Sequence, residues 1–211
     1  MSIFLLLQPR CVLIHIPKTG GTSLRKGVWG GNYEGPEFGA VPARWKHEFK
    51  FAFVRHPLCR LTSAYRMFTE GAIGDPSWKL PEDARPLSFD AFLDIVLDES
   101  IIFDQRRRTF EEKIRHHTIP QTHPFNALYD ADFVGRYERL DADFRIIADR
   151  VGLRGVPVPR MHFTKAKPYR AYFNAQQLEK MVDYYRTDFE QLQYGLPEDL
   201  GDRISPPQDP A

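Results

Sequence analysis

The chain has 211 residues, 42% of them hydrophobic, which is enough apolar sequence for one sizeable core. Its formal net charge of +1 argues against a general nucleic-acid binder, so any positive field must be local. The two cysteines, Cys11 and Cys59, lack metal-ligand spacing, and we expect reduced core residues. We expect one domain over residues 1–196 and a disordered tail over 197–211, where prolines recur.

The first predicted strand leads into a turn with anion-binding chemistry. The apolar run Cys11–Ile14 predicts a strand, and Thr22–Trp29 begins a helical pattern. Backbone N–H groups in such a turn point at one spot, glycines let the backbone come close, and a lysine and three hydroxyls add donors. Gly-Gly after a strand can also be a simple turn, but these donors favour a phosphate- or sulfate-binding loop. Its lysine precedes the glycines, unlike the GxxxxGK[ST] loop of ATPases. The loop residues are Pro17, Lys18, Thr19, Gly20, Gly21, Thr22 and Ser23.

A second strand leads to a second set of donors. Phe49–Val54 is aromatic and β-branched, which predicts a buried strand, and Pro57 suits the first turn of the helix that follows. Arg55 therefore lies at the carboxyl end of a strand, where open α/β sheets bind ligands. With Arg60 and Ser63 it could hold a second phosphate, although Arg55 alone could equally be a structural ion-pair residue.

The rest of the chain alternates loops with amphipathic segments. Glycine and proline predict loops over Gly30–Pro42 and Gly71–Pro86, and Asp132–Tyr137 predicts another buried strand. Helical spacing and capping residues predict a short helix after Ser88, an exposed helix over Gln105–His117, a helix over Asp141–Val151 ended by Gly152, and a last helix capped by Asn174. The apolar stripe of the last helix indicates core packing and not a cofactor site.

Together the two anion-binding segments resemble those of the sulfotransferases that use 3′-phosphoadenosine 5′-phosphosulfate (PAPS). The first matches the PKTGGTS-type loop, which in that family holds the 5′-phosphosulfate. The second matches the pattern R-x-P-x-x-R-x-x-S-x-Y, which in that family holds the 3′-phosphate, at Arg55, Pro57, Arg60, Ser63 and Tyr65. The pair of motifs is specific.

Later segments resemble the branch that contains the carbohydrate O-sulfotransferases. They are His117–Gln121, which reads HTIPQ, then Asp132–Leu140, Lys167–Arg170 and Asp188–Gly195, so the resemblance runs from about Val12 to Gly195. It implies an α/β fold: a single-domain, P-loop-like, three-layer arrangement with a central, mostly parallel sheet flanked by helices. It also implies PAPS as donor, no metal, and a hydroxylated acceptor such as a saccharide or glycoconjugate.

Sulfuryl transfer needs a cation at the bridging oxygen and a base at the acceptor. Lys18 is the cation inside the loop, and we assign it to that oxygen, where negative charge grows as the bond breaks. His117 ranks first as general base because it begins the H-x-x-P-Q element, and Glu48 ranks second. The base assignment stays open to five other histidines: His15, His47, His56, His116 and His123.

The nucleotide and the acceptor need further contacts. A basic–aromatic cluster of Lys165, Lys167, Tyr169 and Arg170 either closes over the nucleotide or is a solvated surface run. Arg136 and Tyr137 are weaker candidates. The loops Gly30–Pro42, Gly71–Pro86 and 116–126 are expected to shape the acceptor pocket. The acceptor contacts that we expect from them and from the approach to the second strand are Tyr33, Phe38, His47, Trp78, Gln121 and Phe125.

Two other functions are compatible with parts of the sequence. A kinase of related fold would be expected to carry a GK[ST] loop and a magnesium carboxylate, and a non-catalytic nucleotide-binding relative would not need Lys18 with Arg55 and Ser63. The apolar run of Met1–Leu7 has no basic region before it and is too short to span a bilayer. Carbohydrate sulfotransferases of eukaryotic secretory compartments carry an N-terminal membrane anchor. We instead expect a cytoplasmic, bacterial-type enzyme without stable membrane insertion or a nucleic-acid partner.

Overall fold

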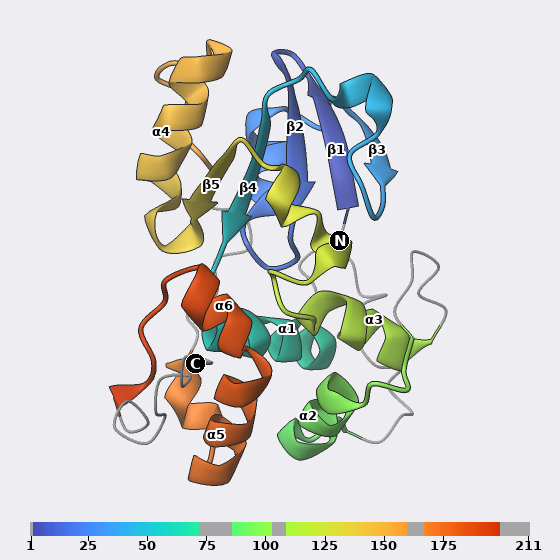
Figure 1. Cartoon of the computed structure of the whole chain (residues 1–211). Helices are drawn as coiled ribbons and strands as arrows, with labels where there is room; N and C mark the ends of the chain where they lie inside the picture. The colour runs from blue at the N-terminus through green and yellow to red at the C-terminus, as the bar shows by residue number, and fades with distance from the viewer. Residues whose placement is uncertain (1, 72–85, 103–108, 160–166, 199–211) are drawn as a thin grey trace, which may run out of the picture.

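The computed structural model describes residues 2–71, 86–102, 109–159 and 167–198, which form a mixed α/β structure with a sheet half and a helical half (Figure 1). The sheet has the order β3-β1-β2-β4-β5. Its strands are β1 Ser2–Leu7, β2 Arg10–His15, β3 Tyr33–Glu37, β4 Lys50–Val54 and β5 Phe133–Arg136. β4 pairs in parallel with β2 and β5, whereas β1 is antiparallel to β2 and β3. Every strand except β1 therefore points the same way, and the carboxyl ends of β2 and β4 face the helical half.

The strands β2 and β4 confirm the two predicted buried strands, but two edge features differ from expectation. β1, formed by the N-terminal apolar run, pairs with β2 from Ser2↔His15 to Leu7↔Arg10. β3 lies inside the predicted loop Gly30–Pro42 and pairs with β1 at the edge of the described sheet. β5 was expected to be buried, yet it is an edge strand, and Val134 is 41% exposed.

The two faces of the sheet are covered differently. One face packs against the short π-helix η1 (Ser23–Val28) and the helix α4 (Leu140–Val151), where Phe144 and Ile147 meet Phe51 and Phe53. The other face is covered by irregular segments that contribute Trp45 and Ala127. The expected three-layer arrangement, with helices flanking the sheet, is therefore incomplete, because most helices lie at the carboxyl end of the strands.

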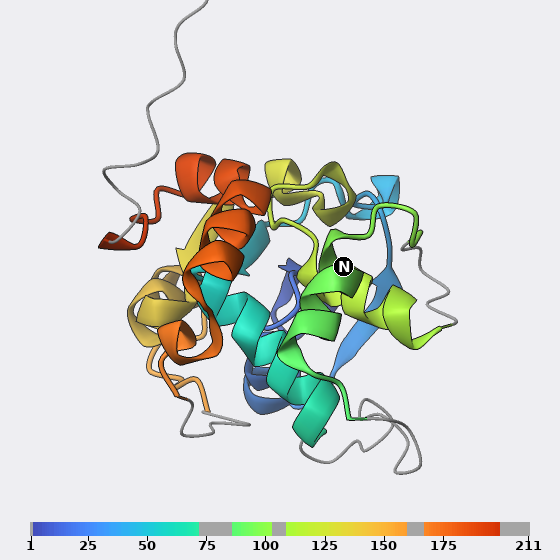
Figure 2. The same ribbon diagram turned by 90° about the horizontal axis from the view of Figure 1, so that it is seen from below.

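The helical half has its own apolar core. It comprises α1 Pro57–Glu70, α2 Phe89–Leu97, α3 Phe110–Thr118, α5 Ala175–Tyr184 and α6 Arg186–Gln191. Figure 2 shows α1 passing between the pair α2 and α3 and the pair α5 and α6. Phe68 of α1, Phe92 of α2 and Tyr185 between α5 and α6 are all buried in this core.

The predicted caps are confirmed, but two helices differ from prediction. Ser88 accepts the N–H of Ala91, and Asn174 forms a capping box with Gln177. The expected exposed helix over Gln105–His117 begins at Phe110, and its last residues, 114–118, are buried against α1. The predicted last helix is divided at residue 185 into α5 and α6.

Some predicted features lie outside the described residues. These are most of the loop Gly71–Pro86 with Trp78, the cluster residue Lys165, and the tail from residue 199 onward.

Candidate active site

The turn after β2 contains two residues with left-handed backbone. Lys18 has a φ of 71° and Gly20 a φ of 90°, whereas Thr19 between them does not have a positive φ. Such alternation turns successive N–H groups toward one side, as in anion-binding nests. A left-handed lysine costs about 1 kcal/mol or more, and strain of this kind is concentrated at functional sites. The Thr19 hydroxyl donates to the carbonyl of Ile16 at 2.8 Å and ties the turn to the strand end.

The two glycines of the turn are required by what packs against them. A Cβ on Gly21 would lie 2.0 Å from Cδ2 of His15, so the imidazole occupies the space that a side chain would need. A Cβ on Gly20 would lie 3.3 Å from the rings and methyl groups of Tyr137 and Leu140. His15 therefore packs against Gly21 of the turn, and its role there is structural. Burial and nearby positive charge, including that of Arg25, His117 and Lys18, hold its pKa well below the ordinary value.

Lys18 is a partly buried cation. Burial and the charges of Arg55 and Arg66 lower its pKa to about 8. Among the residues that the structure describes, no Asp or Glu forms an ion pair with Lys18 or Arg55. Two neighbouring cations that lack a carboxylate form a site suited to an anion.

Arg55 brings the second motif to the first. Its Nη1 donates to the backbone carbonyl of Lys18 at 3.2 Å, and its guanidinium lies 4.4 Å from the ring centroid of Tyr137. The same Tyr137 ring lies over Gly20. The two predicted anion motifs are thus adjacent, at the carboxyl ends of β2 and β4.

Two residues of the second motif have different surroundings. Ser63 is partly exposed on α1, in the turn after Arg60. Arg60 is 1% exposed, and its guanidinium donates to the carbonyls of His117, Thr118 and Ile119. This differs from the expected phosphate contact. The buried charge of Arg60 instead satisfies the last carbonyls of α3, which no helical N–H can reach.

His117 lies in the last turn of α3 and is 8% exposed. Its Nδ1 lies 2.8 Å from the carbonyl of Lys113, which can only accept, so Nδ1 carries the proton in the neutral ring and Nε2 is the acceptor nitrogen. A neutral imidazole with Nε2 unprotonated can take up a proton at Nε2. Nη1 of Arg60 donates to the carbonyl of His117 at 2.9 Å, which places the end of α3 beside the start of α1, the helix that follows β4.

Gln121 is completely buried, which differs from the expected acceptor contact. Its side-chain amide exchanges two hydrogen bonds with the backbone of Arg55, and its Nε2 also donates to Asp188. These bonds leave it no role at an open surface.

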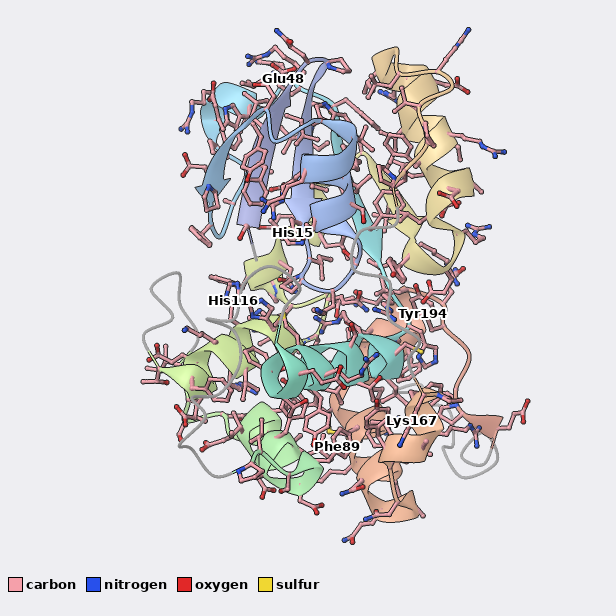
Figure 3. All side chains as sticks on the ribbon, turned by 180° about the vertical axis from the view of Figure 1, so that it is seen from behind. His15, Glu48, Phe89, His116, Lys167 and Tyr194 are labelled. Atoms are coloured by element: carbon pink, nitrogen blue, oxygen red, sulfur yellow. The ribbon has the colours of Figure 1, made fainter. Side chains whose placement is uncertain are left out.

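The structure places three predicted residues away from this end of the sheet. Glu48 precedes β4 and pairs with Arg10 at 2.9 Å. Figure 3 shows Glu48 at the end of the sheet remote from His15, and the separation of seven positions between Glu48 and Arg55, mostly in extended chain, corresponds to about 20 Å. Glu48 and the exposed His47 beside it therefore cannot serve as base or acceptor contact here. Tyr33 packs edge-on against Phe4, with its ring 5.1 Å from the Arg25 guanidinium.

The described part of the basic–aromatic cluster lies beside the Arg55 motif. Tyr169 stacks on His56 with ring centroids 5.1 Å apart, and His56 directly follows Arg55. Lys167 and Arg170 on either side of Tyr169 are exposed. Arg136, a weaker candidate, donates instead to the carbonyls of Leu192 and Gln193.

Two acidic residues at the site were missed from the sequence. Glu138 accepts the N–H of His56 at 2.7 Å and the hydroxyl of Tyr194 at 3.0 Å. Asp188 is fully buried and accepts four hydrogen bonds from Gln121 and Thr122. The sequence contained an indication of Asp188, because this residue lies on the apolar stripe of the predicted last helix and is therefore expected to be buried. A buried carboxylate requires hydrogen-bond partners.

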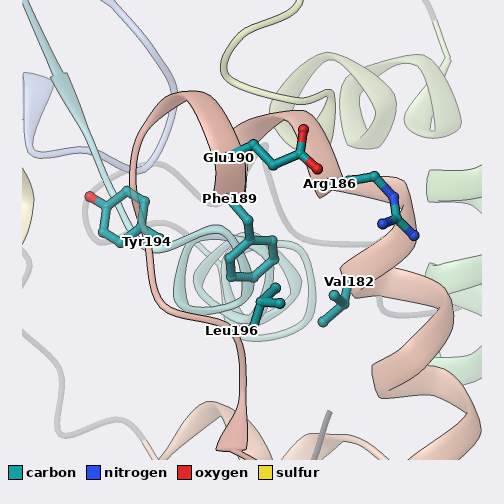
Figure 4. A pocket seen from close by; sticks show the side chains of 6 residues that line it. All are labelled: Val182, Arg186, Phe189, Glu190, Tyr194 and Leu196. Atoms are coloured by element: carbon teal, nitrogen blue, oxygen red, sulfur yellow. The ribbon is translucent and has the colours of Figure 1, made fainter. Parts of the chain in front are cut away.

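A pocket of about 170 Å³ lies beside α6 (Figure 4). It is lined by Val182, Arg186, Phe189, Glu190, Tyr194 and Leu196. None of these residues belongs to the two anion motifs. The pocket is therefore a separate feature, linked to the site through the bond between Tyr194 and Glu138.

Two further features concern the part of the chain that the structure describes. No group of three or more His, Cys, Asp or Glu side chains there could hold a metal ion. None of the helices in residues 2–71, 86–102, 109–159 and 167–198 has the length and apolarity needed to cross a membrane. Both cysteines are reduced, as expected, and burial raises the pKa of Cys11 to about 12.

Comparison with known proteins identifies relatives of the chain. Residues 36–195 match the model of the sulfotransferase family, a range that includes the Arg55 motif and begins after the Pro17–Ser23 loop. The chain is 30% identical over 178 residues to human carbohydrate sulfotransferase 14 and 27% identical over 183 residues to the zebrafish (Danio rerio) protein of that name. These alignments cover 73% of this chain but 44% and 46% of the relatives, so the chain spans less than half of their length. No solved structure matches it.

The family match covers most of the chain, and the curated relatives are carbohydrate sulfotransferases. The segments that match include those that converge at the carboxyl ends of β4 and β5. The chain belongs to the sulfotransferase family, in a group similar to the carbohydrate sulfotransferases.

Proposed function

We propose that the protein transfers the sulfuryl group of PAPS to a hydroxyl of a saccharide or glycoconjugate. The observation that carries the proposal is the contact between Arg55 Nη1 and the Lys18 carbonyl at 3.2 Å. It joins the two motifs into one region with two cations and no paired carboxylate among the described residues. A donor with phosphates at both ends of its ribose fits such a region.

Each motif binds one part of the donor. The turn Pro17–Ser23 binds the 5′-phosphosulfate through its N–H groups, Lys18 and its hydroxyls. Arg55, with Ser63 on α1, binds the 3′-phosphate. Lys167, Tyr169 and Arg170 lie on the His56 side of Arg55 and contact the nucleotide from there.

In the chemical step, the acceptor oxygen forms a bond to sulfur while the bond from sulfur to the bridging oxygen breaks. The electron pair of that bond stays on the bridging oxygen, which becomes negative. Lys18 stabilises this charge, and its partial burial strengthens the interaction relative to water. The proton of the acceptor hydroxyl moves to Nε2 of His117, which is unprotonated because Nδ1 donates to the Lys113 carbonyl. The positive charge in this scheme comes from side chains and backbone amides.

The acceptor class comes from the relatives, which are named as carbohydrate sulfotransferases. The hydroxyl of a sugar ring must enter on the side of the turn where His117 lies.

Donor binding is the sharpest test. Calorimetry should compare 3′-phosphoadenosine 5′-phosphate with adenosine 5′-phosphate, which lacks only the 3′-phosphate. Arg55→Ala should weaken the first ligand by about tenfold or more and the second far less, because a charge-assisted hydrogen bond is lost only with the first. Equal losses would refute the assignment. Tight binding of ATP with magnesium in place of either ligand would favour a kinase.

Turnover separates an enzyme from a binding protein. Wild-type protein with radiolabelled PAPS should label at least one glycan in a panel, and Lys18→Ala should label it about 10²–10³-fold more slowly. Donor binding without label transfer to any glycan would indicate a non-catalytic relative or another acceptor class.

A further inference from the structure

Arg55 lies one residue beyond the sheet. β4 pairs with β2 as far as Ala52↔Ile14 and with β5 as far as Val54↔Arg136. The N–H and C=O of Arg55 therefore need partners from outside the sheet, since partly buried backbone groups without partners are costly.

One side chain supplies both partners. The N–H of Arg55 donates to Oε1 of Gln121 at 2.9 Å, and Nε2 of Gln121 donates to the carbonyl of Arg55 at 2.7 Å. A primary amide offers a donor and an acceptor together, which a carboxylate or hydroxyl of similar reach cannot do in this geometry. Gln121 thus holds the tip of β4 as a neighbouring strand would.

The orientation of that amide is fixed from α6. Oδ2 of Asp188 accepts the backbone N–H of Gln121 at 2.8 Å and its Nε2 at 3.2 Å. Oδ1 of Asp188 accepts the N–H and the hydroxyl of Thr122 at 2.9 and 2.8 Å. Gln121 and Asp188 are both 0% exposed. Asp188 attracts the N–H₂ group, so Oε1 must face Arg55 N–H.

We propose that Gln121 and Asp188 are positioning residues for the 3′-phosphate: they fix the backbone of Arg55 so that its guanidinium lies beside the turn of Lys18. This inference rests on the proposed function, because it assigns Arg55 to that phosphate. The Arg55 guanidinium contacts the Lys18 carbonyl and the Tyr137 ring. The position of the Arg55 backbone, from which this side chain extends, is fixed by the two hydrogen bonds from Gln121. A displacement of such a group by about 1 Å can lower the catalytic rate about 100-fold.

The test uses Gln121→Met, which keeps the side-chain length and removes both hydrogen bonds to Arg55. Calorimetry should show about a tenfold or larger loss for 3′-phosphoadenosine 5′-phosphate and less than about a twofold change for adenosine 5′-phosphate. The matched control is Thr122→Val, which removes a hydrogen bond to the same Asp188 but touches no part of Arg55. It should leave both affinities within about twofold.

A second variant and a double mutant keep the test decisive. Asp188→Asn should give the same selective loss, with Gln121 itself unchanged. In an Arg55→Ala background, Gln121→Met should have no further effect on the 3′-phosphate ligand, because its action passes through Arg55. Equal losses for both ligands, or an undiminished loss in that background, would overturn the inference alone. Failure of the wild-type protein to bind 3′-phosphoadenosine 5′-phosphate would overturn the proposed function and this inference with it.

Discussion

The two ends of the sheet handle charge in opposite ways. At the amino ends of the parallel strands, Arg10 pairs with Glu48 at 2.9 Å and Lys50 with Asp132 at 2.9 Å. At the carboxyl ends, Lys18 and Arg55 have no carboxylate partner among the described residues, and their mutual repulsion helps to lower the pKa of Lys18. Repulsion between neighbouring cations is destabilising unless an anion joins them. This difference supports the proposal that an anion binds at the carboxyl end, whereas these charges at the amino end pair with one another.

The two candidates for the general base, His117 and Glu48, lie at opposite ends of the sheet. Substituting each in turn gives the largest expected difference in turnover. His117→Ala should lower turnover by about 10²–10⁴-fold while donor binding survives, because a general base acts on the acceptor. Glu48→Gln should lower it by less than about twofold, since Glu48 forms only a partly exposed surface ion pair with Arg10. Steady-state turnover at saturating donor measures both. A large loss in Glu48→Gln with an active His117→Ala would reverse the comparison.

Lys18 and Arg10 compare one cation from each end. Lys18→Ala should reduce turnover at saturating donor by about 10²–10³-fold, as expected for removal of one donor that stabilises transition-state charge. Its effect on affinity for 3′-phosphoadenosine 5′-phosphate should be smaller. Arg10→Ala, the control, should leave both quantities unchanged. If Lys18→Ala loses affinity only, Lys18 binds the donor in its ground state and has no special role in the transition state.

The turn at the carboxyl end should also be sensitive to added volume. Gly21→Ala places a methyl group inside van der Waals contact with His15 and should lower the free energy of unfolding by about 1–3 kcal/mol. Gly195→Ala, whose Cβ would meet nothing within 4 Å, should change it by less than about 0.5 kcal/mol. Denaturant unfolding of both variants measures the difference. Equal stability would mean that His15 moves aside at no cost.

The smallest expected effect is on the pH dependence of donor binding. The pKa of Lys18 is lowered to about 8, so the unliganded protein loses this charge as the pH rises through that value. A bound anion favours the charged form. Affinity for 3′-phosphoadenosine 5′-phosphate should therefore fall above pH 8, by at most about tenfold per pH unit, with proton uptake on binding. Lys18→Arg should remove the uptake, because arginine stays charged. Calorimetry in two buffers of different ionisation enthalpy measures it, and uptake that persists in Lys18→Arg would assign the proton to another group.

Local sequence was sufficient where a feature depends on neighbours along the chain. The buried strands β2 and β4, the caps at Ser88 and Asn174, and the turn at Gly152 were predicted, and all are confirmed. Each depends on apolar runs, side-chain oxygens or a glycine within a few residues. The resemblance to sulfotransferases was likewise carried by two contiguous motifs.

Tertiary structure decided what each motif residue contacts. Arg55 and Arg60 lie five residues apart in one motif, yet the first reaches the turn of Lys18 and the second the end of α3. The direction of a long side chain depends on which distant segment packs beside it, and spacing alone does not specify that segment. The same holds for Gln121, whose amide was expected at the surface and is enclosed between β4 and α6.

The sequence by itself therefore determined the family, the two motifs that we propose to bind anions and the strands that lead into them, because these are encoded in contiguous residues. Only the tertiary structure placed Glu48 and His117 at opposite ends of the sheet, gathered the helices at the carboxyl end and gave Asp188 its hydrogen-bond partners. The physical reason is that these contacts join residues 60 or more positions apart, and their geometry is set by packing of the whole chain.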